Sequence, residues 1–301
     1  MEQAVHNGEA AYEIIPRQGL DFDLGGDIPK YWLGGDPFKT RFFDAMSCLF
    51  PEGEKFFIAC VRDYKDQITD PELVQQVKDF TRQEGQHGMV HTQFNNRLAE
   101  QGIEVNKILE KQVSIMFGFF RKRLPASYTL GQTAAAEHMT AIMAHGFFRH
   151  RSLMAEADAR VRAMYAWHAV EEIEHKAVAY DVLTKVAKAG YFVRVLSFLQ
   201  VALSFPLHVF LIMNHMFRKD GFGFWKRSGL WLRGLWWLYQ PTSRGLYAPL
   251  IGHFLAYLVP GFHPWKGGQM ESYGIWRSTY DRTGDPIAAG DAMHLAAGAA
   301  A

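Results

Sequence analysis

The chain has 301 residues and a mass of 34.3 kDa, enough for one large domain or two small ones. Apolar residues make up 49% and charged residues 21%, which excludes a disordered or collagen-like chain. The 32 Lys and Arg nearly balance the 31 Asp and Glu, which argues against a general nucleic-acid-binding protein. Two cysteines cannot build a disulfide framework and the polar N-terminus is no signal peptide, so we expect a cytoplasmic protein.

Residues 1–35 are rich in Gly, Pro and Asp and show no sustained period, so we expect an extended N-terminal arm. Residues 36–190 carry apolar residues three and four apart, the spacing of helices. The first helical stretch begins near Asp36. Pro51 interrupts it and either kinks one helix or begins another.

Three further helical stretches follow. The second opens with Asp70 as its N-cap and ends at Gly102. The third covers about residues 104–150, with a break near Pro125, and the fourth covers about residues 155–188. Alternating strand patterns with hairpin turns are nearly absent. The sequence therefore predicts an all-α fold in which four helices form an antiparallel bundle.

The composition changes after this bundle. Residues 195–217 contain no acidic, Lys or Arg residue and are long enough to span a bilayer, and residues 245–262 are also uncharged. If both crossed the membrane, the basic, Trp-rich segment between them would lie outside, against the positive-inside tendency. We therefore expect residues 191–280 to form apolar helices that pack on the bundle or lie in the membrane interface, with ordinary core helices as the alternative. Residues 281–301 have low complexity and predict a flexible tail.

The pattern Glu-x-x-His occurs twice, as Glu84 with His87 and as Glu172 with His175. Each pair falls in a different predicted helix. Residues three apart share one helix face, so each carboxylate and its imidazole can approach the same metal ion.

Two glutamates, Glu54 and Glu137, stand alone in apolar helical surroundings. With the two pairs they give one Glu from each of two helices and Glu-x-x-His from each of the other two, the set that binds two metals in a four-helix bundle. Carboxylates and imidazoles suit Fe or Mn, and buried carboxylates without a cation are costly. Glu52 competes with Glu54 because Pro51 leaves the helix phase open. For each residue alone the alternative is a solvated helix residue, which we would favour for Glu84 taken by itself.

Three neighbours of these residues extend the predicted site. His168, one turn before Glu172, would add an imidazole to one metal. Glu171 would accept the second ring N–H of His87, with a solvent-facing glutamate as the alternative. His91 lies one turn beyond His87, and we favour a hydrogen-bonded pocket histidine over a ligand or a base.

The segments FPEGEKFF, QEGQH, AAAEHMTA and WHAVEEIEHKAVAYDV resemble a bacterial family described as predicted metal-dependent hydrolases, over about residues 35–280. That family is similar to the ferritin-like superfamily of di-iron carboxylate proteins. By the superfamily pattern the resemblance implies six ligands: Glu54, Glu84, His87, Glu137, Glu172 and His175. The added His168 looks like the seventh ligand of the arylamine N-oxygenases. Neither HExxH nor GxSxG is present to support the hydrolase description.

The resemblance implies a di-iron oxidase or oxygenase, with two Fe ions, Mn or a mixed pair, O₂ as co-substrate and an external electron donor. The apolar C-terminal third favours a hydrophobic substrate, lipid-like or an amine, and a place on the inner face of the membrane. A two-metal hydrolase and a non-catalytic, membrane-associated metal-binding protein are the alternatives. The aromatic content also favours association, such as a homodimer.

Overall fold

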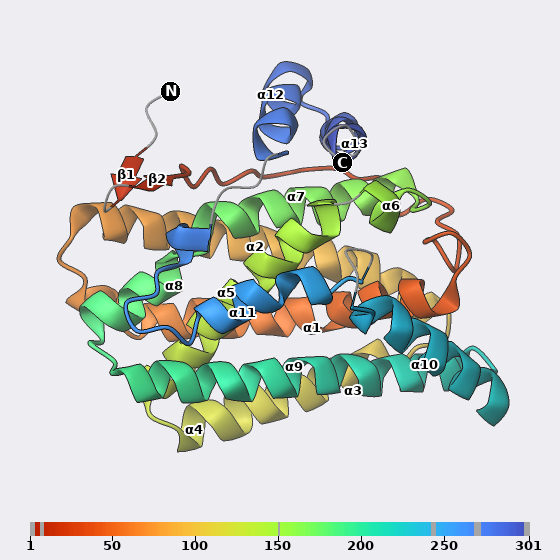
Figure 1. The fold of residues 1–301 in the computed structure, drawn as a ribbon, viewed down its shortest axis with the longest axis horizontal. Coiled ribbons are helices and arrows are strands. Elements are labelled where there is room, and N and C mark those ends of the chain that lie inside the picture. Colours follow the sequence, from red (N-terminus) through yellow and green to blue (C-terminus); the bar gives the residue numbers. More distant parts are fainter. Residues whose placement is uncertain (1–3, 7–8, 150, 242–244, 268–271, 298–301) are drawn as a thin grey trace.

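The computed structural model describes residues 4–6, 9–149, 151–241, 245–267 and 272–297, and helices dominate it (Figure 1). The α-helices are α1 (Pro37–Arg62), α2 (Pro71–Glu100), α3 (Val105–Val113), α4 (Arg121–Arg123), α5 (Ala126–Arg149), α6 (Arg151–Met154), α7 (Ala159–His175), α8 (Val178–Asp181), α9 (Tyr191–Lys219), α10 (Phe224–Tyr239), α11 (Ile251–Ala256), α12 (Tyr273–Thr283) and α13 (Pro286–Ala296). The 3-10 segments are η1 (Lys65–Gln67), η4 (Ala248–Leu250) and η5 (Pro264–Gly267), and the π-helices are η2 (Ser114–Phe120) and η3 (Val182–Val186). Two three-residue strands, β1 (Ala4–His6) and β2 (Glu9–Ala11), pair antiparallel. The predicted all-α class is confirmed.

Helix α1 runs without a break through Pro51. A proline inside a helix leaves the carbonyl four residues earlier without its N–H partner. Here that carbonyl belongs to Ser47, and it accepts a 2.9 Å hydrogen bond from Nδ2 of Asn95 on α2. The neighbouring helix thus satisfies the group that the proline frees, and α1 keeps one helical phase on both sides of it.

The predicted boundaries of the second helix are close to those observed. The carboxylate of Asp70 accepts from the backbone N–H of Glu72 at 3.0 Å, and the chain turns at Gly102, whose φ is +80°. The third predicted stretch is divided into α3, η2 and α4 before Pro125, and α5 follows. The fourth is divided after His175 into α8 and η3.

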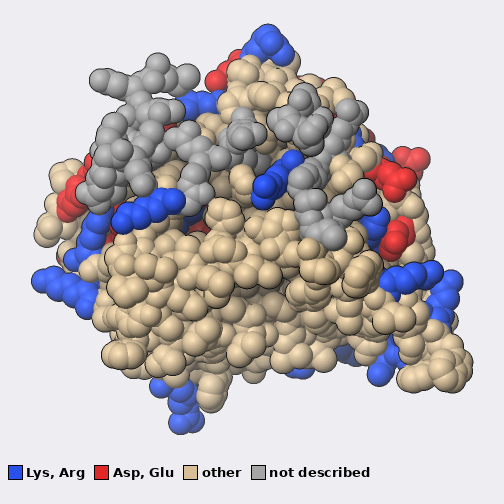
Figure 2. Space-filling model, viewed as in Figure 1, with Lys and Arg blue, Asp and Glu red and all other residues tan. Residues whose placement is uncertain are grey.

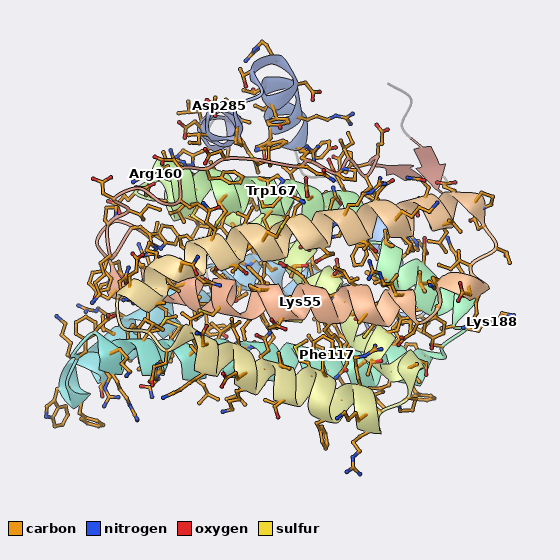
Figure 3. The ribbon with its side chains drawn as sticks, turned by 180° about the vertical axis from the view of Figure 1, so that it is seen from behind. Lys55, Phe117, Arg160, Trp167, Lys188 and Asp285 are labelled. Atoms are coloured by element: carbon orange, nitrogen blue, oxygen red, sulfur yellow. The ribbon has the colours of Figure 1, made fainter. Side chains whose placement is uncertain are left out.

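Four helices, α1, α2, α5 and α7, pack side by side, α1 against α2 and α5 against α7. Figure 3 shows α1 and α2 from behind as two long neighbours. Buried aromatic side chains, including Trp32, Phe43 and Trp167, fill one end of the space between the helices. The ferritin-like form of this bundle stays a prediction.

The N-terminal arm is part of the core. Phe22, Leu24 and Trp32 are buried, and the ring of Phe22 lies 5.5 Å from that of Trp167 on α7. Figure 1 shows the arm running along α7. Its missing helical period reflects an extended path over the helices.

Helix α9 lies along α5 and α1 on the outside of the bundle, and α10 and α11 follow it (Figure 1). Among the described residues, α9 is the one helix whose length and apolar composition would allow it to cross a bilayer. One such helix is weak evidence for a membrane span.

Within the tail predicted to be flexible, residues 281–301, the structure has the end of α12 and the helix α13, while residues 298–301 lie outside the described part of the chain. Asp285 caps α13 by accepting from the N–H of Ile287 at 2.8 Å. At Gly290 a Cβ atom would lie 2.7 Å from the Cα of Ala163 on α7. The small residues that resemble low complexity in the sequence permit close helix packing.

Candidate metal centre

One buried cluster of carboxylates and imidazoles lies inside the bundle, with contributions from α1, α2, α5 and α7. No member is more than 5% exposed. The cluster brings together all seven residues predicted as ligands: Glu54, Glu84, His87, Glu137, His168, Glu172 and His175. Their candidate ligand atoms form overlapping groups in which the atoms lie within 4.8 Å of one another.

The first group surrounds His175 at the end of α7. Its Nε2 lies 3.1 Å from Oε1 of Glu84, 3.2 Å from Oε2 of Glu137 and 3.7 Å from Oε2 of Glu172. One imidazole nitrogen therefore faces carboxylates from three helices.

The second group consists of Glu54, His87 and His168. The two imidazole rings stack, with centroids 4.0 Å apart. Glu172 lies between the groups: its Oε1 is 2.9 Å from Nε2 of His168 and 3.8 Å from Nδ1 of His87, while its Oε2 faces His175. Glu172 thus connects the two groups through its two carboxylate oxygens.

Several of these buried atoms have no hydrogen-bond partner among the described residues. They are both carboxylate oxygens of Glu54, Glu84 and Glu137, Nδ1 of His87 and Nε2 of His175. Burial, together with neighbouring carboxylates, raises the pKa of Glu54 and of Glu137 well above the usual range. Unpartnered buried polar groups are costly, and cations among them would satisfy these atoms and favour ionised carboxylates. The residues therefore fit bound metal ions.

Hydrogen bonds fix the tautomer of His175. The Nε2 of Gln83 lies 2.7 Å from Oε2 of Glu174 and 3.2 Å from the carbonyl oxygen of Ile15, both acceptors, so this atom is the amide NH₂. Its Oε1 must then accept from Nδ1 of His175, at 2.8 Å. Nε2 of His175 is thereby directed at the cluster, where a metal ion would replace the proton that the neighbouring carboxylates favour.

The tautomer of His87 follows from Glu171. The Nε2 of His87 lies 3.1 Å from Oε2 of Glu171, whose other oxygen accepts from Arg17 at 3.0 Å. Burial raises the pKa of Glu171, and Arg17 opposes that rise. Burial also lowers the pKa of His87, so the ring is neutral and donates its one N–H to the carboxylate. Nδ1 then presents its lone pair to the cluster, as expected for an acid that orients a ligating histidine.

A series of hydrogen bonds through Asn95, Ser47 and His91 orients His168. The Nδ2 of Asn95 donates to a carbonyl, so its Oδ1 accepts from the hydroxyl of Ser47 at 2.8 Å. The Ser47 oxygen then accepts from Nδ1 of His91 at 2.8 Å, and Nε2 of His91 accepts from Nδ1 of His168 at 2.7 Å. The chain thus holds the His168 ring with Nε2 toward Glu172, at 2.9 Å from its Oε1. His91 therefore lies behind a candidate ligand, as the favoured interpretation expected.

Glu52 and Glu54 point to different sides of α1. The carboxylate of Glu52 pairs with Lys55 at 2.7 Å, at the partly exposed side of α1, while Glu54 points into the cluster. Of the two competing glutamates, the structure brings Glu54 to the site.

Sequence reasoning missed the groups behind the cluster. The buried carboxylate of Glu174 accepts hydrogen bonds from Arg17 at 2.8 Å, from the hydroxyl of Tyr273 at 2.8 Å and from Gln83. Glu174 could have been suspected, because it stands in the same acidic run as Glu172 in an otherwise apolar helix. No signal marks Arg17, since the arm has no period and the contact joins residues 157 positions apart.

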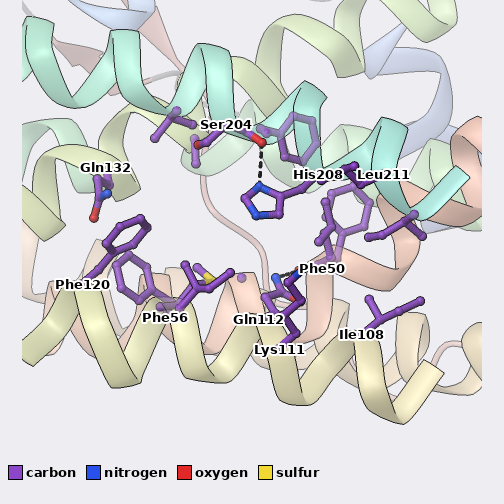
Figure 4. A pocket seen from close by; sticks show the side chains of 18 of the residues that line it. Phe50, Phe56, Ile108, Lys111, Gln112, Phe120, Gln132, Ser204, His208 and Leu211 are labelled. Carbon is purple, nitrogen blue, oxygen red and sulfur yellow. Dashed lines mark hydrogen bonds between the residues drawn. The ribbon is translucent and has the colours of Figure 1, made fainter. Parts of the chain in front are cut away.

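A cavity of about 500 Å³ adjoins the cluster (Figure 4). Most of its lining is apolar, and it lies between α1, α3 with η2, α5 and α9. Thr140 lines it and donates a hydrogen bond to Glu172. Phe50, also in the lining, has its ring 4.9 Å from that of His168. Gly53 and Ala136, directly before two candidate ligands, complete the wall toward the cluster.

Polar side chains contribute a minor part of the cavity's exposed lining. They include Glu104, Lys107, Lys111, His208 and His215. Figure 4 shows the imidazole of His208 between the helices. Its Nδ1 donates to the carbonyl oxygen of Ser204 at 2.7 Å, which leaves Nε2 as an acceptor. A molecule here would meet an apolar wall and a few orienting groups.

Fold and site together define an all-α, metal-dependent protein with buried His and Glu groups that could hold metal ions. The chain belongs to the family described as predicted metal-dependent hydrolase, whose model matches residues 16–268. That match includes every residue of the cluster and Arg17 of the arm. No curated protein and no solved structure matches the chain.

Proposed function

We propose that this protein is a dimetal oxidase or oxygenase that uses O₂ to oxidise a hydrophobic small molecule, lipid-like or an amine. The observation that carries the proposal is the donor set, four Glu and three His in two groups bridged by Glu172 beside an apolar cavity. Carboxylate-rich sites with imidazole suit iron or manganese, which change oxidation state.

The proposed ligands divide between two ions. His87 and His168 with Glu54 would hold one, and His175 with Glu84 and Glu137 the other, while Glu172 would contact both. Two bound iron ions, two manganese ions or a mixed pair would supply electron transfer to O₂.

The chain's own residues would bind and orient the substrate. The apolar cavity walls exclude water, so the oxidised group would lie against Phe50, Gly53, Ala136 and Thr140, the residues nearest the cluster. A polar end of the substrate would meet His208. Reduction of the metals between turnovers requires an external electron donor, which is part of the proposal.

The family description favours a second candidate, a two-metal hydrolase. It would use the same ligands, with one ion activating water, and would need no electrons. The apolar lining suits a hydrophobic substrate and offers few groups to bind a polar one, which is why we place the oxidase first.

Metal analysis followed by a redox test separates the two. Protein purified in air is assayed for Fe, Mn and Zn, reduced without oxygen and mixed with O₂ in a stopped-flow spectrometer. The oxidase predicts bound Fe or Mn, O₂ consumption and a transient visible absorption, all lost in Glu137→Ala and Glu172→Ala. Tightly bound Zn, no reaction of the reduced protein with O₂ and turnover of ester or amide substrates would favour the hydrolase and overturn the proposal.

A further inference from the structure

Helix α9 exposes a continuous stripe of large apolar side chains. Spacings of three and four residues place them on one side of the helix. The stripe consists of Phe192, Leu196, Leu199, Leu203, Leu207 and Leu211. Leu203 is 75% exposed, although leucine in a soluble protein normally lies in the core.

The following helices extend this apolar surface. Trp225 and Trp236 of α10 are exposed, Trp225 to 84%, and so are Ile251 and Leu255 of α11. Figure 2 shows an uninterrupted tan face over α9 and α11. Apolar patches of this extent mark sites that contact a protein or a membrane.

The charged residues of the segment that forms this surface are nearly all basic. Residues 191–265 hold seven Lys and Arg but a single acid, Asp220. The side chain of Asp220 is buried and pairs with Arg41 and Lys30. The neighbouring acid Glu104 of the segment before α3 pairs with Lys219 at 3.0 Å, and the other cations of the surface outnumber it. Exposed cations at the edge of the surface include Arg218, Lys219, Lys226 and Arg233. Figure 2 shows Lys and Arg at the rim of the tan face and no acidic side chain within it.

We propose that this face, formed by α9, α10 and α11, docks on an anionic lipid bilayer with the helices parallel to its surface. Leucine and tryptophan would enter the headgroup and acyl boundary, and the Lys and Arg of the rim would contact anionic headgroups. Exposed tryptophans suit that boundary, because the ring is apolar and its N–H is polar.

The inner side of α9 explains why the helix lies on the bilayer and does not cross it. Met213 and Phe217 are buried against the bundle, and Arg194 near the other end is buried and donates to the carbonyl of Val259 at 3.0 Å. A helix packed at both ends on other helices offers lipid one side alone. Leu211 belongs both to the stripe and to the cavity lining, so a docked bilayer would adjoin the cavity.

Flotation with lipid vesicles tests the docking. The full chain is mixed with vesicles of phosphatidylcholine alone or with 30% phosphatidylglycerol. We expect it to float with the anionic vesicles and at least tenfold less with the neutral ones. A double variant, Leu203→Glu with Leu207→Glu, should lose at least tenfold in binding. Leu295→Glu on α13 is the matched control, because Leu295 is 57% exposed and Leu207 is 56% exposed, and it should bind as the wild type does.

Three results would overturn the proposal. First, failure to float with anionic vesicles, together with a dimer in light scattering that the double variant dissociates, would show that a second copy covers the face. Second, equal binding to both vesicle types by the double variant and by Leu295→Glu would show that the face plays no part. Third, resistance to extraction by alkaline carbonate would show that α9 spans the bilayer. Circular dichroism of each variant confirms that it is folded.

Discussion

The Nε2 of His175 on α7 lies 3.1 Å from Oε1 of Glu84 on α2, and neither atom has a hydrogen-bond partner among the described residues. On the opposite side of the ring, Oε1 of Gln83 accepts a hydrogen bond from Nδ1 of His175 at 2.8 Å. Burial opposes protonation of the ring, but the carboxylates of Glu137, Glu172 and Glu84 outweigh it and raise the pKa of His175 well above its usual range. Without metal, Nε2 therefore holds a proton among these carboxylates, and a bound cation would take the place of that proton.

The first prediction compares the metal content of variants at Glu54 and Glu52, two glutamates of α1. Glu54→Gln removes a carboxylate from the cluster and should lower bound metal from about two ions per chain to one or fewer. Glu52→Gln is the matched control, because Glu52 pairs with Lys55 away from the cluster, and it should leave the metal content unchanged. Mass spectrometry of metals in purified protein measures both. Equal metal content in the two variants would remove Glu54 from the ligand set.

The second prediction concerns Gln83, which touches no proposed metal. Gln83→Leu leaves Nδ1 of His175 without its acceptor, so the ring can rotate or change tautomer. We expect metal affinity to fall about 10–100-fold, the usual cost of losing such a partner. Competition with a chelating dye measures the affinity. Gln75→Leu, an exposed position on the same helix, should retain wild-type affinity, and the role fails if both variants bind metal equally.

The candidate ligands and Gln83 differ in how well the sequence predicts them. Glu84, His87, Glu172 and His175 were predictable, because helical spacing alone puts each pair on one face. Gln83 was not, since an amide beside a ligand carries no pattern and its role depends on Glu174 and the arm.

The third prediction concerns the cavity. Ala136→Leu adds bulk to the cavity wall directly before Glu137, so apolar molecules should be excluded while the ligands stay in place. Binding of the fluorescent fatty acid cis-parinaric acid should weaken at least tenfold, with unchanged metal content. Ala99→Leu, at an exposed site on α2, serves as the control. Undiminished probe binding by Ala136→Leu would show that the cavity is not where such molecules bind.

The fourth prediction concerns acid stability. Burial opposes ionisation of Asp220, but hydrogen bonds from Arg41 and Lys30 outweigh it and lower its pKa. A carboxyl with a lowered pKa stabilises the fold above its unfolded-state value of about 4, and this contribution is lost as the pH falls through the lowered pKa. Asp220→Asn should therefore reduce the free energy of unfolding by about 3 kcal/mol at pH 7, with a smaller difference in more acidic solution.

Urea unfolding at pH 7 and pH 3.5 measures this difference. Asp79→Asn is the control, because its partner Arg82 is exposed and such pairs contribute less than about 1 kcal/mol. A loss for Asp220→Asn that is independent of pH would contradict ionisation as its cause.

The parts of the fold that escaped prediction share one property, dependence on distant contacts. The arm has no period, yet Arg17 on it pairs with Glu171 and Glu174 of α7. The alanine-rich tail resembles a loose segment until Gly290 is seen against Ala163. Local patterns could locate the helices and most of the cluster, but not segments whose order comes from the surfaces they cover.

Anomalous diffraction from crystals of the metal-loaded protein tests the central claim most directly. With data collected at the iron and manganese absorption edges, the account predicts two anomalous peaks inside the cluster. One should lie beside His87, His168 and Glu54, the other beside His175, Glu84 and Glu137, with Glu172 reaching both. A single peak, a peak outside the cluster, or metal-loaded protein with no peak there would contradict the two-metal centre.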